Sequence, residues 1–278
     1  MAELLFRDKK VYYEVHGNSG DPIVILNGIM MSTASWKPFI ETMSRQNHLI
    51  LVDFFDQGQS ARLEGETYDH SLQVELLDAV LEEVSGQIWY ERFTIMGISY
   101  GGEVAIQYAL VHPKRVRRLI LANTCGRTSG WLKKIGDGWN EVAKTGSGYA
   151  YYLTTIPVIY STKFFEDRAA WMENREAYLT EYFGREDVRR ALIRLTDSSV
   201  GYNVVDRLCE ITCPTLIISS DQDVLVPPTE QQLLHEKIKG SVYVTINGSG
   251  HASMYEAPES FAALTLGFAN IPDKGISI

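Results

Sequence analysis

The chain has 278 residues, a mass of 31.3 kDa and a net charge of −9, with 45% hydrophobic and 22% charged residues. These proportions are close to the globular average and exclude long intrinsic disorder as the main character of the chain. The acidic balance, without a basic cluster, argues against nucleic acid as a partner and against docking on anionic membranes, because both depend on attraction between cationic side chains and phosphate.

Cysteine usage and apolar run length indicate where the protein works. Cys125, Cys209 and Cys213 form no CxxC pair, and we expect free thiols in a reducing compartment rather than a disulfide or a metal site. The first ten residues, MAELLFRDKK, lack the basic region and apolar core of a signal peptide. No apolar run approaches the ~18 residues that a membrane span needs. We therefore expect a cytoplasmic protein without a membrane span.

The first part of the chain alternates short apolar runs with amphipathic stretches. The apolar runs predict strands at residues 11–15, 22–26, 48–53, 92–96 and 118–122. The amphipathic stretches predict helices at residues 35–44, 71–83 and 102–111. Continuous apolar strands are typical of a sheet covered on both faces. The alternation predicts an α/β fold, with a mostly parallel open sheet and helices on both faces.

This alternation stops after about Asn123. Residues 126–207 are rich in aromatic side chains on helix-like segments and contain no convincing parallel-type strand. Further strands are expected at 214–218 and 242–246, followed by a helix at 258–268. We therefore expect a core domain of residues 1–125 and 208–278, and a helical cap of residues 126–207. Aromatic side chains of this cap are expected to line an apolar pocket.

The strand that ends at Met96 runs into Gly97-Ile98-Ser99-Tyr100-Gly101, and a helix follows. This G-x-S-x-G sequence lies in the strand–turn–helix context that exposes a nucleophilic serine, so Ser99 is the candidate nucleophile. The tight turn requires small neighbours, which Gly97 and Gly101 supply.

A serine hydroxyl becomes a good nucleophile only when a base takes its proton. With this kind of turn, the acid and then the histidine are expected after the serine. His235 lies in a helical stretch, whereas His251 lies in a glycine-rich loop after a strand, and we favour His251 because such loops carry catalytic groups. Asp221 and Asp223, after the strand at 214–218, both remain candidates for the acid.

A tetrahedral oxyanion needs preorganised backbone N–H donors. One is expected from Tyr100, which follows the candidate nucleophile. The second is expected from Ile29, in the loop that begins Asn27-Gly28, where the glycine lets the backbone approach closely.

Together these motifs resemble the α/β-hydrolase superfamily, from Val11 to about Phe268. The resemblance implies a triad of Ser99, Asp223 and His251, and it favours Asp223 over Asp221 as the acid. It also implies that no metal or organic cofactor takes part.

The chain departs from the usual family pattern at three places. Asn27 stands where the family usually has histidine, and Ser220 stands where it usually has glycine. The segment Gln57-Gly58-Gln59 differs from the glycine pattern often found after the next strand. These departures affect the oxyanion loop rather than the triad.

We predict an enzyme, a serine hydrolase that cleaves a carboxylic ester of a small or medium apolar acyl compound. Asn27-Gly28 followed by Met31-Ser32-Thr33-Ala34-Ser35, together with Gly58-Gln59-Ser60, resembles a narrower branch over about the first third of the chain. That branch is the hydroxyalkanoyloxyalkanoate synthase of rhamnolipid synthesis, and the resemblance implies acyl transfer from a thioester as the alternative. A third hypothesis is a binding protein on an inactive hydrolase fold, which a complete triad disfavours. Glutamates of the cap could recognise an amine, although solvated helix faces explain them more simply: Glu166, Glu173, Glu176 and Glu181. The sequence leaves the bond type and the oligomeric state open.

Overall fold

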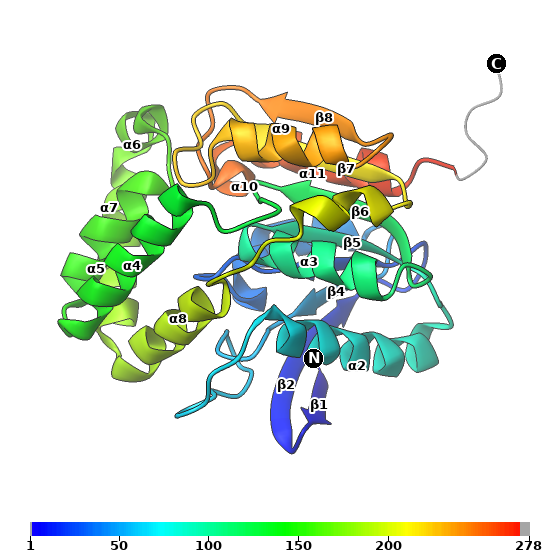
Figure 1. Cartoon of the computed structure of the whole chain (residues 1–278), viewed down its shortest axis with the longest axis horizontal. Coiled ribbons are helices and arrows are strands. Elements are labelled where there is room, and N and C mark those ends of the chain that lie inside the picture. Colours follow the sequence, from blue (N-terminus) through cyan, green and yellow to red (C-terminus); the bar gives the residue numbers. More distant parts are fainter. Residues whose placement is uncertain (1, 273–278) are drawn as a thin grey trace.

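The computed structural model describes residues 2–272, which form an eight-stranded sheet with helices on both faces and at one end (Figure 1). The strand order is β1-β2-β4-β3-β5-β6-β7-β8. The strands are β1 (Ala2–Phe6), β2 (Lys9–His16), β3 (Ile23–Leu26), β4 (Leu49–Val52), β5 (Phe93–Ile98), β6 (Val116–Ala122), β7 (Thr215–Ser220) and β8 (Val242–Ile246). β2 is antiparallel to both β1 and β4, and every other pair is parallel. The predicted fold class is therefore confirmed.

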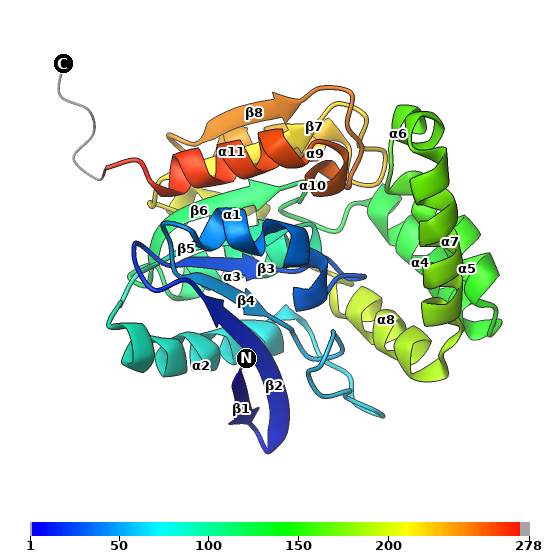
Figure 2. The same cartoon turned by 180° about the vertical axis from the view of Figure 1, so that it is seen from behind.

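Both faces of the sheet are covered, which explains the continuous apolar strands. Every residue of β3, β4, β5 and β7 is buried. One face packs against α2 (His70–Ile88), α3 (Tyr100–Val111) and α9 (Pro228–Lys237). The other face packs against α1 (Ile40–Ser44) and α11 (Pro258–Ala269), which lie in front of the sheet in Figure 2.

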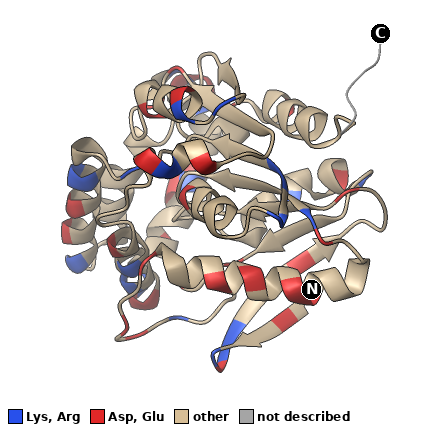
Figure 3. Ribbon diagram, turned by 45° about the vertical axis from the view of Figure 1, so that its right-hand side comes forward, with Lys and Arg blue, Asp and Glu red and all other residues tan. Residues whose placement is uncertain are grey.

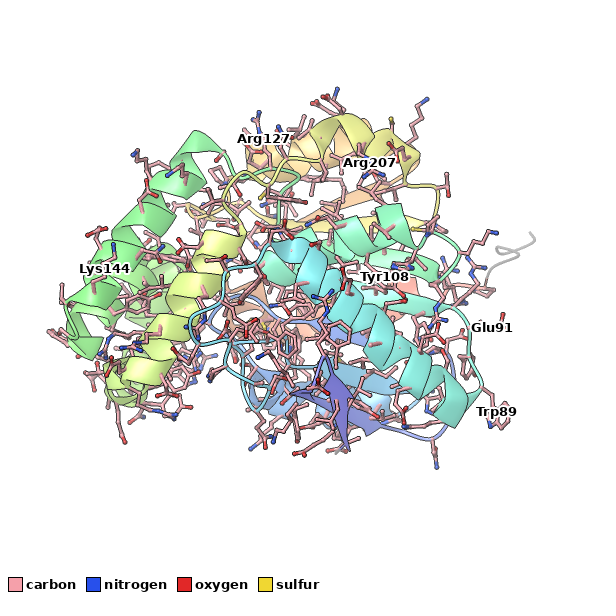
Figure 4. The ribbon with its side chains drawn as sticks, turned by 60° about the horizontal axis from the view of Figure 1, so that its bottom comes forward. Trp89, Glu91, Tyr108, Arg127, Lys144 and Arg207 are labelled. Atoms are coloured by element: carbon pink, nitrogen blue, oxygen red, sulfur yellow. The ribbon has the colours of Figure 1, made fainter. Side chains whose placement is uncertain are left out.

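Three elements differ from the sequence prediction. β1 was not expected; its five residues form a short edge strand that alternates between half-buried and exposed side chains, with Leu5 in solvent. The helix expected at 35–44 is a 3₁₀ helix, η1 (Thr33–Phe39), followed by the short α1, and Pro38 removes one amide donor from it. α2 continues past the expected end to Ile88, where Trp89 adopts φ 61° and points into solvent (Figure 4).

Between β6 and β7 the chain forms a separate group of helices. They are α4 (Gly130–Lys144), α5 (Gly148–Thr155), η2 (Ile156–Val158), α6 (Thr162–Asp167), α7 (Ala169–Gly184) and α8 (Glu186–Ser198), and η3 (Val205–Glu210) leads back to β7. Figures 1 and 2 show α4 to α8 together at one end of the sheet. Serine side chains cap the N-termini of α4, α5 and α6 by accepting a hydrogen bond from a backbone N–H: Ser129, Ser147 and Ser161.

Polar contacts join these helices to the sheet domain. Arg194 of α8 pairs with the fully buried carboxylate of Asp56, with 2.6 Å between Nη2 and Oδ1. At the end of α8, Ser198 Oγ lies 2.9 Å from the hydroxyl of Tyr100. A buried carboxylate without its cation is costly, so these contacts fix α8 against the sheet.

The surface charges are mixed rather than gathered by sign. Figure 3 shows basic and acidic residues interspersed over α4 to α8, whereas α2 carries acidic bands. Within residues 2–272, no helix combines the length and the apolar character that a membrane crossing requires.

Candidate active site

The turn at Ser99 lies between β5 and α3 and is held in a strained conformation, with φ 53° and ψ −122°. A Cβ atom on Gly97 would lie 2.3 Å from the carbonyl oxygen of Gly101, and one on Gly101 would lie 2.2 Å from that of Leu26. Both positions therefore require glycine. The Ser99 carbonyl accepts hydrogen bonds from the Gly102 amide at 2.8 Å and the Thr124 hydroxyl at 2.7 Å.

The register of the parallel strands brings three loop residues to the same edge of the sheet. Leu26 pairs with Gly97, and Ile98 pairs with Ala122. Because these strands run in the same direction, Asn27, Ser99 and Asn123 follow at neighbouring carboxyl ends. Ligand sites of open α/β sheets lie at this edge.

His251 and Asp223 form a buried hydrogen-bonded pair. Nδ1 of His251 lies 2.9 Å from Oδ2 of Asp223, whose side chain is fully buried. The other carboxylate oxygen, Oδ1, accepts the amides of Leu225 at 3.1 Å and Val226 at 2.9 Å. The carboxylate is therefore fixed by its own turn and orients the imidazole through Nδ1, which leaves Nε2 available for proton transfer.

Asn123 is a supporting residue that the sequence prediction did not identify. Its Nδ2 donates to Oδ2 of Asp223 and to Oγ of Ser220, both at 3.0 Å, and its Oδ1 accepts from Ser253 Oγ at 2.6 Å. Ser220, at the family's usual glycine position, thus supplies a hydrogen-bond acceptor. A polar residue directly after a buried strand is the sequence signal for this role.

The two competing candidates lie elsewhere. His235 belongs to α9, where its Nδ1 lies 2.8 Å from the hydroxyl of Ser241. Asp221 is exposed and accepts the Gly248 amide at 2.6 Å, which is the chemistry of a turn. Neither residue lines the cavity that contains Ser99.

The loop after β3 is held by three buried polar side chains. Nδ2 of Asn27 donates to the Val52 carbonyl at 2.8 Å, and Oδ1 of Asn27 accepts from the Trp36 indole at 2.8 Å. Nε2 of Gln57 donates to the Gly28 carbonyl at 2.9 Å. In a trans peptide the carbonyl and the following N–H point in opposite directions, so Gln57 also fixes the direction of the Ile29 N–H.

The amides of Ile29 and Tyr100 are available as donors. Within the described residues, neither donates to a protein acceptor. Both residues line the cavity that contains Ser99, and Gly28 approaches closely enough that a Cβ there would lie 3.5 Å from Cβ of Ser99. Such a pair of free amides beside a hydroxyl can bind an oxyanion.

The cavity above Ser99 is open to solvent, and the centres of water-sized molecules can occupy about 140 Å³ of it. Ser99 and His251 both line it, and α4, η2 and α7 contribute an apolar wall. Aromatic lining residues are Trp139 of α4, Phe183 of α7 and Tyr160, which lies between η2 and α6. Other aromatic side chains of α4, α5 and α7 are exposed instead: Trp131, Tyr149 and Tyr178.

Burial keeps the neighbouring phenol and thiol groups neutral. It raises the pKa of Tyr160 to about 12 and raises that of Tyr100 further, against an opposing hydrogen bond from Ser198. Burial, assisted by the charge of Glu103, raises the pKa of the Cys125 thiol well above its usual value. None of these groups therefore competes with Ser99 as a ready anionic nucleophile near pH 7. Residues 2–272 contain no group of three or more histidine, cysteine, aspartate or glutamate side chains arranged to hold a metal ion.

Comparisons with known proteins agree with this architecture. The family model for the alpha/beta hydrolase fold matches residues 21–258. The crystal structure of MGS-M2, an alpha/beta hydrolase enzyme from a Medee basin deep-sea metagenome library, is 45% identical, covers 100% of both chains and superposes with a TM-score of 0.95. A protein of Azorhizobium caulinodans named as a carbamate hydrolase, RutD, is 26% identical over 96% of this chain and 97% of its own.

A more distant structure, the esterase EaEST from Exiguobacterium antarcticum, shares the fold. It is 22% identical, covers 96% of this chain and 98% of its own, and has a TM-score of 0.80. The family match spans most of the chain and includes the Ser99 turn and His251. The chain therefore belongs to the α/β-hydrolase fold family, and the hydrolase class implied by its motifs is confirmed.

Proposed function

We propose that this protein is a serine hydrolase that cleaves a carboxylic ester of an apolar acyl compound through an acyl-enzyme on Ser99. The observation that carries the proposal is that Ser99 and His251 line one largely apolar cavity, with Nδ1 of His251 held by Asp223. In this proposal α4 to α8 serve as the cap that shapes the cavity. The free thiols of Cys125, Cys209 and Cys213 support a cytoplasmic location.

The proposed reaction has two halves. Ser99 Oγ attacks the ester carbonyl while Nε2 of His251 takes the hydroxyl proton, and the resulting imidazolium is stabilised by Asp223. The amides of Ile29 and Tyr100 donate to the oxyanion. The tetrahedral intermediate collapses, the carbon–oxygen bond to the alcohol breaks, and His251 returns the proton to that alcohol. Water, activated by His251, then attacks the acyl-enzyme and releases the acid and free Ser99.

Hydrolysis is preferred to acyl transfer on two grounds. The cavity is open to solvent, so water has access to an acyl-enzyme. The relatives named above are described as hydrolases, one of them for carbamates and one for esters. A carbamate carries the same electrophilic carbonyl carbon, but the apolar wall of the cavity favours an acyl chain over a compact polar group.

Replacing the nucleophile tests the proposal directly. Ser99→Ala should reduce ester hydrolysis to the background rate, because the acyl-enzyme cannot form, while the melting temperature stays close to that of the wild type. A fluorophosphonate probe followed by mass spectrometry should modify Ser99 in the wild type and leave the variant unmodified. Residual turnover by a folded Ser99→Ala protein would contradict the mechanism.

The acid is tested by comparing the two neighbouring aspartates. Asp223→Asn should lower kcat by about four orders of magnitude, because an amide no longer selects the productive imidazole tautomer. Asp221→Asn is the matched control, since Asp221 is exposed and contacts only a turn amide, and its kcat should stay within about threefold of the wild type. A larger loss from Asp221→Asn would transfer the role to that residue.

The oxyanion loop is tested through Gln57, whose side chain binds the Gly28 carbonyl and so holds the peptide that carries the Ile29 amide. Gln57→Leu should lower kcat by about ten- to hundredfold with little change in KM, because the amide is no longer held in the direction that serves the transition state. Gln73→Leu is the control, since Gln73 is equally buried but bonds the backbone of Phe55. Equal losses of kcat from the two variants would reduce the role of Gln57 to packing.

An apolar acyl pocket predicts a dependence on chain length. Each buried methylene contributes roughly 0.8 kcal/mol, so kcat/KM should rise about fourfold per added carbon until the pocket is full. The measurement is kcat/KM for p-nitrophenyl esters from acetate to octanoate. A flat profile would contradict the apolar acyl substrate while leaving the triad intact.

A further inference from the structure

The charged side chains that line the cavity differ in whether they have a partner of opposite charge within the protein. They are Glu103, Lys133, Asp137, Arg175 and Asp197. Oε2 of Glu103 lies 2.9 Å from Nε2 of His70, and Lys133 and Asp137 pair with each other at 2.7 Å. Asp197 accepts from Nδ2 of Asn140 at 2.7 Å. Two of these lining residues, Asp197 and Arg175, have no ion pair among the described residues. Asp197 is exposed to solvent, whereas Arg175 is partly buried.

Arg175, on α7, lies among aromatic rings rather than carboxylates. Its guanidinium carbon is 5.4 Å from the ring centre of Trp171 and 5.1 Å from that of Tyr255. Its Nε is buried and has no hydrogen-bond partner among the described residues. Cation–π contacts stabilise the charge but do not accept the in-plane N–H bonds of the guanidinium. The hydroxyls of Tyr160 and Tyr255 also interact with the guanidinium, but they are neutral. Because arginine stays protonated, Arg175 is a largely desolvated cation whose Nε donor is unused and whose charge has no counter-ion among the described residues.

The position of Arg175 is set by the junction between the cap and the histidine loop. Tyr255 follows His251 by four residues, and its hydroxyl donates to the Ser35 carbonyl at 3.3 Å. The neighbouring carboxylate of Glu256 is already occupied, because it accepts the Ser161 amide at 3.1 Å and the Ser161 hydroxyl at 2.5 Å. Arg175 therefore lines the part of the cavity beside the histidine loop, and the carboxylate next to Tyr255 is engaged elsewhere.

The glutamates that could have recognised an amine lie outside the cavity. Glu166, Glu173 and Glu181 are exposed, and none of them lines it. Glu176 is half-buried and is not part of the lining either. The carboxylate of Asp197 lines the cavity but is exposed to solvent and bonds Asn140. Among the lining residues that are not exposed, the charge without a counter-ion is therefore the positive charge of Arg175.

We propose that Arg175 binds a carboxylate of the substrate, so that the preferred substrates are esters whose acyl or alcohol part carries a free carboxylate. This inference rests on the proposed function and adds the substrate class to it. The N–H groups of a guanidinium match the two oxygens of a carboxylate, and the aromatic surroundings strengthen that pairing by excluding water. The apolar wall accommodates the methylene chain between the ester and the carboxylate.

The kinetic test compares substrates that differ only in the terminal charge. Monoethyl esters of succinate, glutarate and adipate are each compared with the ethyl ester of the unsubstituted acid of the same length, and ethyl hexanoate is compared with carboxymethyl hexanoate for the alcohol side. At least one carboxylate substrate should exceed its neutral match in kcat/KM by about ten- to hundredfold, the range for a charged hydrogen-bonded contact. Arg175→Gln should remove most of this preference, and Arg175→Lys should retain part of it. A wild type that prefers every neutral ester overturns the proposal.

Lys133→Gln is the matched control, because Lys133 is a cation of the same cavity wall that already pairs with Asp137. It should keep the preference of the wild type for the carboxylate substrate. An equal loss of preference in Lys133→Gln and Arg175→Gln would mean that the general field of the cavity, and not Arg175, selects the anion, which also overturns the proposal.

A binding measurement separates this inference from the proposed chemistry. Adipate should bind Ser99→Ala protein, detected by calorimetry and by a change in tryptophan fluorescence through Trp171, whereas hexylamine should not bind. Adding Arg175→Gln should weaken adipate binding at least tenfold. If the wild type cleaves no ester but adipate still binds through Arg175, the proposed function fails and the anion site stands. If esters are cleaved but adipate binds equally to the Ser99→Ala protein with and without Arg175→Gln, or to neither of them, the anion site is wrong and the proposed function stands.

Discussion

The turn at Ser99 is the constraint on which the rest of the site depends. Its positive φ is possible because Gly97 and Gly101 allow β3 and α3 to approach within distances that no Cβ would tolerate. Tyr100, the next residue, lines the cavity, and its side chain reaches Ser198 at the end of α8. One strained residue thus relates the candidate nucleophile, a candidate oxyanion donor and the position of α8.

Most of the fold could be predicted because its signals are local. The central strands are apolar along their whole length, and the Ser99 motif lies between a strand and a helix in the sequence itself. What could not be predicted depends on tertiary contacts. The edge strand β1 is held by its pairing with β2. α2 packs against α3, where the Tyr108 hydroxyl donates to Asp78 at 2.8 Å (Figure 4). The last turn of α2, which was not expected, makes its own tertiary contact, since Nε2 of Gln87 donates to the Tyr13 hydroxyl at 3.1 Å.

The candidate site shows the same division between local and tertiary information. Asp221 and Asp223 are equally good turn residues in the sequence, and they differ in what surrounds them. Asn123, which lies one hundred residues before Asp223, donates a hydrogen bond to Asp223 and none to Asp221. Arg175 was missed for a related reason. An arginine on a helix of mixed charge suggests a solvated face. That Arg175 packs against aromatic rings and has no carboxylate partner among the described residues follows from tertiary contacts, which no sequence pattern encodes.

The histidine loop packs directly against the helices between β6 and β7. A Cβ on Gly250 would lie 2.6 Å from the Ser161 amide, and the Ala252 amide donates to the Ile159 carbonyl at 3.0 Å, so the loop on either side of His251 packs against the cap. Arg175 touches the same junction through Tyr255. A substitution that moves this part of the cap must therefore move the imidazole as well, because close-packed segments transmit displacement rather than absorb it. Among the described residues, the cavity residues of α4 have no backbone hydrogen bond to the histidine loop, so a substitution there need not displace the imidazole.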